Sequence, residues 1–145
     1  MDFRPTVPVD AAWLLVGGWI GAIVVASGIN PSGVSGSGTE SLFGVGLPLG
    51  LGGLGIDVTV WLHFGAYAVL AWLTARAAGS DDARTALFAL VVASGVGLAI
   101  EAMQATIPAR TASVGDAVVN AAGAGLGVAW RRVTSALRRG SDRDR

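Results

Sequence analysis

The stretch TALFALVVASGVGLAI, residues 85–100, contains no charged side chain and is followed directly by Glu101. A helix that crosses the hydrocarbon core of a bilayer needs about 20 mainly apolar residues. The stretch reaches that length once its flanks, including Glu101, are counted. A helix of a soluble bundle would carry a charged stripe at helical period along its outer face, and these residues carry none. The stretch therefore predicts a membrane-spanning helix with a carboxylate near one end.

Three further apolar stretches have the same character. Residues 11–28 carry no charge, residues 58–75 contain only His63 as an ionisable group, and residues 114–130 contain only Asp116. The first is longer than the apolar core of a secretory signal, which has about 7 to 15 residues, so we interpret it as a retained helix. The sequence thus predicts an all-α, integral membrane four-helix bundle in a domain of residues 1–134, with spans at about 10–29, 58–76, 84–104 and 113–131.

The overall composition agrees with a membrane protein of one domain. Hydrophobic residues make up 52% of the 145 residues and charged residues 14%, whereas a soluble domain has about a quarter charged residues. The absence of cysteine excludes disulfides and cysteine-based metal sites. Residues 135–145 are basic but short, and Asp142 and Asp144 interrupt the positive charge. We therefore expect a disordered cytoplasmic tail and no nucleic-acid partner.

The arginines predict the orientation in the membrane. All ten basic residues are arginine, and nine of them lie in the segments before the first span, between the second and third spans, and after the fourth span. The opposite side, which includes the Gly-rich connection 29–57, has only Arg110. Short loops rich in arginine stay cytoplasmic. We therefore expect a multi-pass protein of the cell membrane with both termini in the cytoplasm.

The few polar residues within the spans fall at a similar depth, toward the outer face. Glu101 lies sixteen residues after Thr85, which corresponds to about 24 Å of helix in a hydrocarbon core about 30 Å thick. His63 comes five residues after the outer end of its span, and Asp116 lies in the first turn of the fourth. Three helices therefore deliver ionisable groups to the outer third of the membrane, where such groups are candidates for function.

Spacing within each helix predicts that these groups have polar neighbours on the same face. Residues three or four positions apart are neighbours on a helix surface. The three pairs with this spacing are His63 with Tyr67, Glu101 with Gln104, and Asp116 with Asn120.

Arg110 lies between the two segments that carry the carboxylates, so its guanidinium is positioned to bridge Glu101 and Asp116. A purely structural interpretation remains open. In it Arg110 closes a tight turn, Asp116 stabilises a helix N-terminus and His63 makes a hydrogen bond between helices. One histidine without a paired motif gives little support to a metal site, and the sequence predicts no metal and no cofactor.

The polar residues resemble the signature of the VanZ-like family of membrane proteins. The resemblance is carried by two motifs, Trp61-Leu62-His63-Phe64-x-x-Tyr67 and Glu101-x-x-Gln104-x-x-x-Pro108-x-Arg110-x-x-Ser113-x-x-Asp116-x-x-x-Asn120-x-x-Gly123. They lie within the latter two thirds of the chain. Members of the family usually have Asp-Lys four and three positions before the histidine, where this chain has Thr59-Val60, so any role of that lysine is not carried over.

The resemblance implies a role in the cell envelope. The family is named after an accessory protein of glycopeptide resistance, and its biochemical activity is poorly defined. We expect the chain to bind or modify a lipid or lipid-linked envelope component at the outer leaflet, with a link to antibiotic or envelope-stress resistance. The residues assigned acid–base or binding roles are Glu101, Asp116 and His63, and those assigned to substrate binding are Arg110, Gln104, Asn120 and Tyr67.

Two other functions remain open from the sequence. A carrier for a small solute or a proton would ordinarily place its site near the midplane, whereas the cytoplasmic halves of the predicted spans are apolar. A non-catalytic structural bundle is the other alternative. Membrane lipids are expected partners, and the small-residue pairs Gly17/Gly21 and Gly123/Gly127 are compatible with packing inside the bundle or against a second copy.

Overall fold

The computed structural model describes residues 9–28, 58–106 and 114–143, and the elements in these ranges are all α-helices. The all-α prediction is confirmed for this part of the chain. The connection 29–57 and Arg110 lie outside the described residues. The four helices are α1 (Val9–Gly28), α2 (Val58–Ala77), α3 (Ala83–Gln104) and α4 (Val114–Arg143).

The first three helices match the predicted spans to within one residue at each end, but α4 does not end where we expect. The sequence predicts disorder from residue 135, whereas α4 continues to Arg143. Two arginines of α4, Arg131 and Arg139, form ion pairs with Asp81 in the α2–α3 connection. These contacts hold the last turns of α4 beside the bundle. The alanine, leucine and arginine residues in these turns also have high helix propensity.

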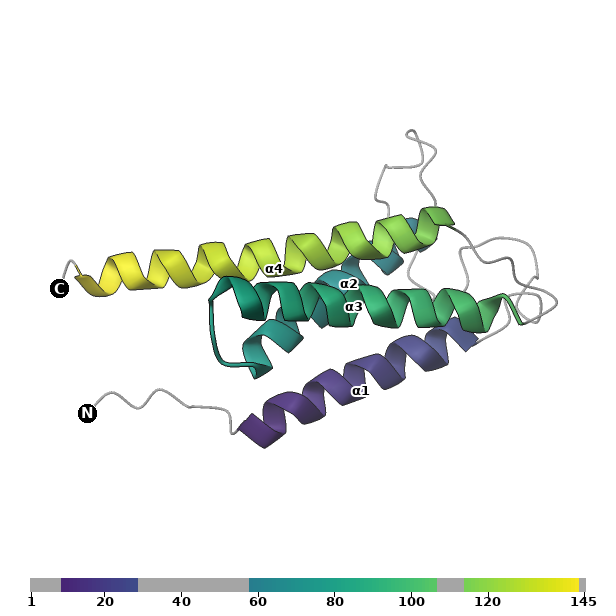
Figure 1. The fold of residues 1–145 in the computed structure, drawn as a ribbon, viewed down its shortest axis with the longest axis horizontal. Helices are drawn as coiled ribbons and strands as arrows, with labels where there is room; N and C mark the ends of the chain where they lie inside the picture. Colours follow the sequence, from purple (N-terminus) through teal and green to yellow (C-terminus); the bar gives the residue numbers. More distant parts are fainter. Residues whose placement is uncertain (1–8, 29–57, 107–113, 144–145) are drawn as a thin grey trace.

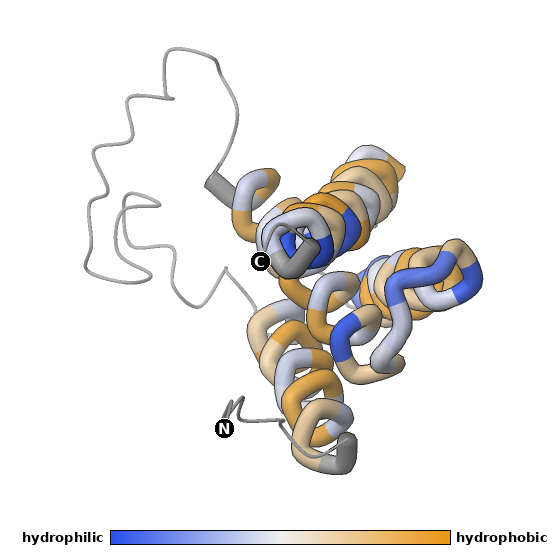
Figure 2. The backbone as a smooth tube through the Cα atoms, turned by 90° about the vertical axis from the view of Figure 1, so that its left-hand side faces the viewer, coloured by the Kyte–Doolittle hydropathy of each residue, from blue (hydrophilic) through white to orange (hydrophobic). Residues whose placement is uncertain are grey.

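The helices run alternately up and down, so the start of α1, the α2–α3 connection and the end of α4 lie at one end of the molecule (Figure 1). We call this the arginine end, because all six arginines whose side chains are described lie there. Figure 2 looks at this end and shows hydrophilic segments near the viewer, with mostly hydrophobic helix behind them. The six described arginines at the arginine end are Arg76, Arg84, Arg131, Arg132, Arg138 and Arg139.

Helices α2 and α4 form the most extensive contact in the bundle. A Cβ atom added at Gly123 would meet the carbonyl oxygen of Phe64, and one added at Gly127 would meet that of Ala68. The two glycines therefore let the backbones of α2 and α4 approach closely, as small residues do between membrane helices. Gly123 and Gly127 pack inside the bundle, whereas Gly17 has open space beside it.

Helix α1 lies at the edge of the bundle and packs mainly on α2. The indole Nε1 of Trp19 donates a hydrogen bond of 2.9 Å to the carbonyl oxygen of Ala66. Val16 and Ile23 of α1 are buried against the central helices.

Among the described residues, two helices are long and apolar enough to cross a membrane, judged by length and composition. They are residues Ala11–Gly28 of α1 and Ala83–Gln104 of α3, and only 17% and 28% of these residues are buried inside the described structure. Large apolar side chains are also exposed on all four helices, for example Leu14 and Val25 on α1 and Leu62 on α2. The same holds for Val91 and Leu98 on α3 and for Val118 and Leu126 on α4.

Candidate functional site

Polar side chains are buried between the helices at the end of the bundle opposite the arginine end. Tyr67 and Asn120 are each 1% exposed, Gln104 is 4% exposed and Glu101 is 5% exposed. Together with the half-buried His63, they form what we call the polar cluster. The cluster draws on the first half of α2, the end of α3 and the start of α4.

The most direct contact in the polar cluster joins α2 and α4. The Nδ1 atom of His63 lies 3.1 Å from the side-chain oxygen of Asn120. Because an amide oxygen only accepts hydrogen bonds, Nδ1 donates, and a neutral imidazole then keeps Nε2 as an acceptor. The imidazole also stacks on the ring of Tyr67, with centroids 6.5 Å apart and planes inclined by 18°. Tyr67, one turn further along α2, therefore orients the imidazole of His63, and Asn120 on α4 fixes the tautomer with its proton on Nδ1.

Helix α3 closes the cluster through a residue without a side chain. A Cβ atom at Gly97 would lie 3.1 Å from Nδ2 of Asn120 and 3.3 Å from Cε1 of Tyr67. The glycine thus lets Asn120 and Tyr67 pack directly on the backbone of α3. Nothing in the sequence pattern distinguishes Gly97 from Gly95, the other glycine of α3, so its role could not be predicted.

The two polar residues at the end of α3 face different neighbours. The Gln104 amide donates a hydrogen bond of 3.4 Å from Nε2 to the carbonyl oxygen of Ser27, which links α3 to the end of α1. The Glu101 side chain is almost fully buried, as is that of Tyr67 on α2.

Two hydrogen-bond donors of the cluster are not used within the described part of the chain. The hydroxyl of Tyr67 and Nδ2 of Asn120 are buried, and neither has a hydrogen-bond partner among the described residues. A buried donor without a partner costs about 1–3 kcal/mol. The cluster is therefore suited to an acceptor oxygen, which a phosphate, a carboxylate, a hydroxyl or a water molecule would supply.

Of the seven predicted site residues, His63 contacts both Asn120 and Tyr67. Glu101 and Gln104 are buried near the end of α3. Asp116 lies in the first turn of α4, one turn before Asn120, and is half-buried. Arg110 is outside the described residues. In the part of the chain that is described, no group of three or more histidine and carboxylate side chains is arranged to hold a metal ion.

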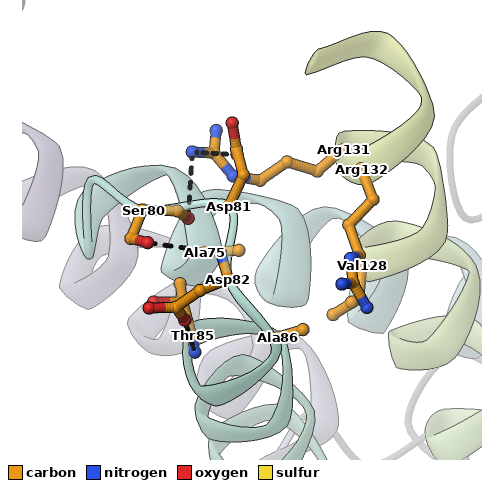
Figure 3. A pocket seen from close by; sticks show the side chains of 9 residues that line it. All are labelled: Ala75, Ser80, Asp81, Asp82, Thr85, Ala86, Val128, Arg131 and Arg132. Carbon is orange, nitrogen blue, oxygen red and sulfur yellow. Dashed lines mark hydrogen bonds and ion pairs between the residues drawn. The ribbon is translucent and has the colours of Figure 1, made fainter. Parts of the chain in front are cut away.

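The arginine end has a different arrangement, which Figure 3 shows from close by. The carboxylate of Asp81 forms ion pairs with Arg131 at 2.9 Å and with Arg139 at 3.0 Å. The pocket beside it, of about 10 Å³, has roughly the room that one water molecule needs. This region joins α4 to the α2–α3 connection through ion pairs.

Asp82 begins α3 at the same end. Its carboxylate accepts a hydrogen bond of 2.7 Å from the backbone N–H of Thr85, the usual contact of an N-cap residue. This hydrogen bond, with a smaller contribution from Ser80, holds the pKa of Asp82 below its ordinary value.

No family model, curated protein or solved structure matches the chain.

Proposed function

We propose that the chain is a multi-pass membrane protein of the VanZ-like type. It binds or modifies a lipid or lipid-linked envelope component at the outer leaflet. The observation that carries the proposal is the polar cluster. Four polar side chains from three helices are almost fully buried inside a bundle whose outer surface is rich in exposed leucine, valine and tryptophan. Such a distribution suits a helical bundle with lipid as its solvent.

Burial of the apolar helices supports four spans. A helix in the core of a soluble protein is mostly buried, whereas only 17% of the apolar stretch of α1 and 28% of that of α3 is buried. Helix α2 is as hydrophobic on average as α3. The first 17 residues of α4, up to Trp130, carry only one charged side chain, that of Asp116.

The arginine end supports the orientation. The six described arginines gather at one end, and arginine-rich segments stay on the cytoplasmic side. Both ends of the described chain lie at this end (Figure 1). The polar cluster is then near the outer leaflet, within reach of lipid headgroups.

Each member of the cluster has a role in this proposal. Nε2 of His63 accepts a proton or a hydrogen bond from the ligand, because Nδ1 is engaged by Asn120. The hydroxyl of Tyr67 and Nδ2 of Asn120 donate to an oxygen of the ligand. Glu101 and Asp116 are the acid–base groups, and Gln104 positions the end of α3 on α1. Arg110 holds a phosphate or carboxylate, a role inferred from the sequence and the family resemblance.

The cytoplasmic half of the bundle gives less support to a carrier. Its buried residues are small and apolar, such as Ala75, Ala89 and Ala93. Among the described residues of this half, the one buried polar side chain is Thr74, and its hydroxyl donates to the carbonyl oxygen of Leu70 within its own helix. No polar path therefore leads from the cluster to the arginine end through the described residues.

The test compares carboxylates at the two ends of the molecule. Glu101→Gln and Asp116→Asn should insert into membranes at wild-type levels but lose protection of cells against envelope stress, including glycopeptide exposure. Asp81→Asn is the matched control, because it makes the same chemical change at the arginine end and should keep the phenotype. Wild-type protection by stably inserted Glu101→Gln and Asp116→Asn would rule out the proposed role. Flux of a solute or protons into proteoliposomes, lost in Glu101→Gln, would point to a carrier instead.

A further inference from the structure

An apolar groove lies on the outer surface of the bundle between α2 and α4, away from the polar cluster. Its volume is about 560 Å³, within the range of about 300–1,000 Å³ that is typical of small-molecule sites. The groove is open along one side, and its walls are almost entirely apolar. The lining residues are Ala68, Val69, Trp72, Leu126, Gly127 and Trp130.

The glycine packing described above creates this groove. Gly127 contributes no side chain, because a Cβ atom there would meet the carbonyl oxygen of Ala68. Ala68 and Gly127 line the groove together with the larger residues Trp72 and Trp130. Both tryptophans lie toward the arginine end of their helices, where aromatic residues mark the membrane–water interface.

An arginine adjoins the groove at this end. The guanidinium of Arg76 lies 5.5 Å from the centroid of the Trp72 ring, and Arg76 is exposed. Among the described residues Arg76 makes no ion pair, and the carboxylate of Asp81 is engaged by Arg131 and Arg139. The groove thus combines an apolar trough with an available positive charge at its cytoplasmic end.

We propose that the α2–α4 groove binds an anionic phospholipid of the cytoplasmic leaflet, with an acyl chain between Trp72 and Trp130 and the phosphate at Arg76. This proposal rests on the membrane location proposed above but not on the chemistry of the polar cluster. Basic residues beside apolar clefts at the cytoplasmic side are the usual elements of such lipid sites. The arginine supplies the preference for a negative headgroup, and the groove supplies the contact with the chain.

A phospholipid fits this surface better than a second copy of the chain. Two copies in one membrane have the same orientation, so a symmetric contact on this face would bring the two arginine ends together. Arg76 would then face the arginines of its neighbour without a free carboxylate among the described residues of the arginine end, because Asp82 caps α3. A lipid phosphate brings the missing negative charge.

The experiment is native mass spectrometry of the full-length chain in detergent, titrated with phosphatidylglycerol or phosphatidylcholine. We expect one phosphatidylglycerol per chain, retained about five-fold more strongly than phosphatidylcholine, as one arginine near a headgroup implies. Arg76→Gln should remove this preference. Arg84→Gln is the matched control, because it removes the same charge from the same end without adjoining the groove, and it should keep the preference.

A second variant tests the groove itself. Val69→Trp places a large ring in the trough and should lower retention of both lipids without changing the melting temperature. Equal retention of the two lipids, an equal loss in Arg76→Gln and Arg84→Gln, or a lipid-free dimer that Val69→Trp disrupts would each overturn the proposal. Carbonate extraction of cell membranes separates the two proposals, because release of the chain would refute the membrane location itself.

Discussion

The two ends of the bundle place their polar side chains in opposite ways. At the polar-cluster end, Tyr67, Glu101 and Asn120 are inside, between helices whose outer faces are apolar. At the arginine end, Asp81 and its arginine partners lie on the outside, where their side chains remain partly exposed. Water and headgroups solvate exposed charges, whereas buried polar atoms depend on partners from the protein or from a ligand. The proposed function therefore assigns ligand binding to the first end, whereas the charges of the second end are solvated or paired.

The α2–α4 crossing joins the two ends, and breaking it should have the largest effect. Gly127→Val would drive a side chain into the carbonyl oxygen of Ala68. Backbone cannot move aside as a side chain can, so we expect a loss of more than about 3 kcal/mol, at or above the usual range for overpacking. Thermal unfolding in detergent measures this loss. Gly125→Val is the control, because nothing lies within 4 Å of a Cβ atom at that position. Equal melting temperatures of the two variants would contradict the close crossing.

The hydrogen bond between His63 and Asn120 should give the next largest effect. We expect a double-mutant cycle with His63→Phe and Asn120→Leu to show a coupling of about 0.6–2 kcal/mol, the range for hydrogen bonds between membrane helices. Asn120→Leu and Thr74→Ala should instead be additive, since the Thr74 hydroxyl bonds within its own helix. Unfolding free energies in mixed micelles provide the measurement. Additivity of the first pair would show that the buried contact contributes nothing to stability.

The ion pairs of Asp81 should matter less, because they are partly exposed. Asp81→Asn should cost about 1 kcal/mol, near the upper value for exposed ion pairs, and the cost should shrink at high salt. Its local effect should be larger, as the last turns of α4 lose their contact with the α2–α3 connection. Hydrogen exchange of the amides in residues 135–143 should become faster in Asp81→Asn but not in Asp81→Glu. Unchanged exchange in Asp81→Asn would mean that the helix end is stable without the ion pairs.

Acid should produce the smallest effect, at the first turn of α3. The pKa of Asp82 is lower in the folded chain than in the unfolded chain. Its stabilising contribution is therefore present above the unfolded pKa of about 3.9 and is lost as the pH falls through the folded pKa. Amide exchange at Thr85 should increase below about pH 4. Asp82→Asn should keep the cap and remove this pH dependence, and a pH profile identical to that of the wild-type chain would exclude Asp82 as the titrating group.

Much of the fold could be predicted from the sequence because its information is local. An uninterrupted apolar stretch predicts a helix wherever it occurs, and the bounds of α1, α2 and α3 follow from the ends of these stretches. The position of a residue along its helix is also local information. Counting residues from the start of each stretch therefore placed His63, Glu101 and Asn120 at the same end of the bundle. The uneven distribution of arginine predicted which helix ends lie together.

The contacts between helices could be decided only by the tertiary structure. Helices that are apolar on all sides show no amphipathic face, so their pattern does not reveal which side packs inward. For that reason the sequence could not distinguish Gly123 and Gly127, which pack on α2, from Gly17, which has open space beside it. For the same reason, the sequence could not predict that Gly97 lies beside Asn120 and Tyr67.

The end of α4 and the contacts within the polar cluster also depend on tertiary structure that the sequence does not reveal. Composition at the C-terminus predicted disorder, but Asp81, more than fifty residues away in the sequence, holds the helix through two arginines. The sequence by itself determined that polar groups gather at one end of the helices. Only the tertiary structure decided that His63 bonds to Asn120, because rotation and crossing of the helices set which side chains meet.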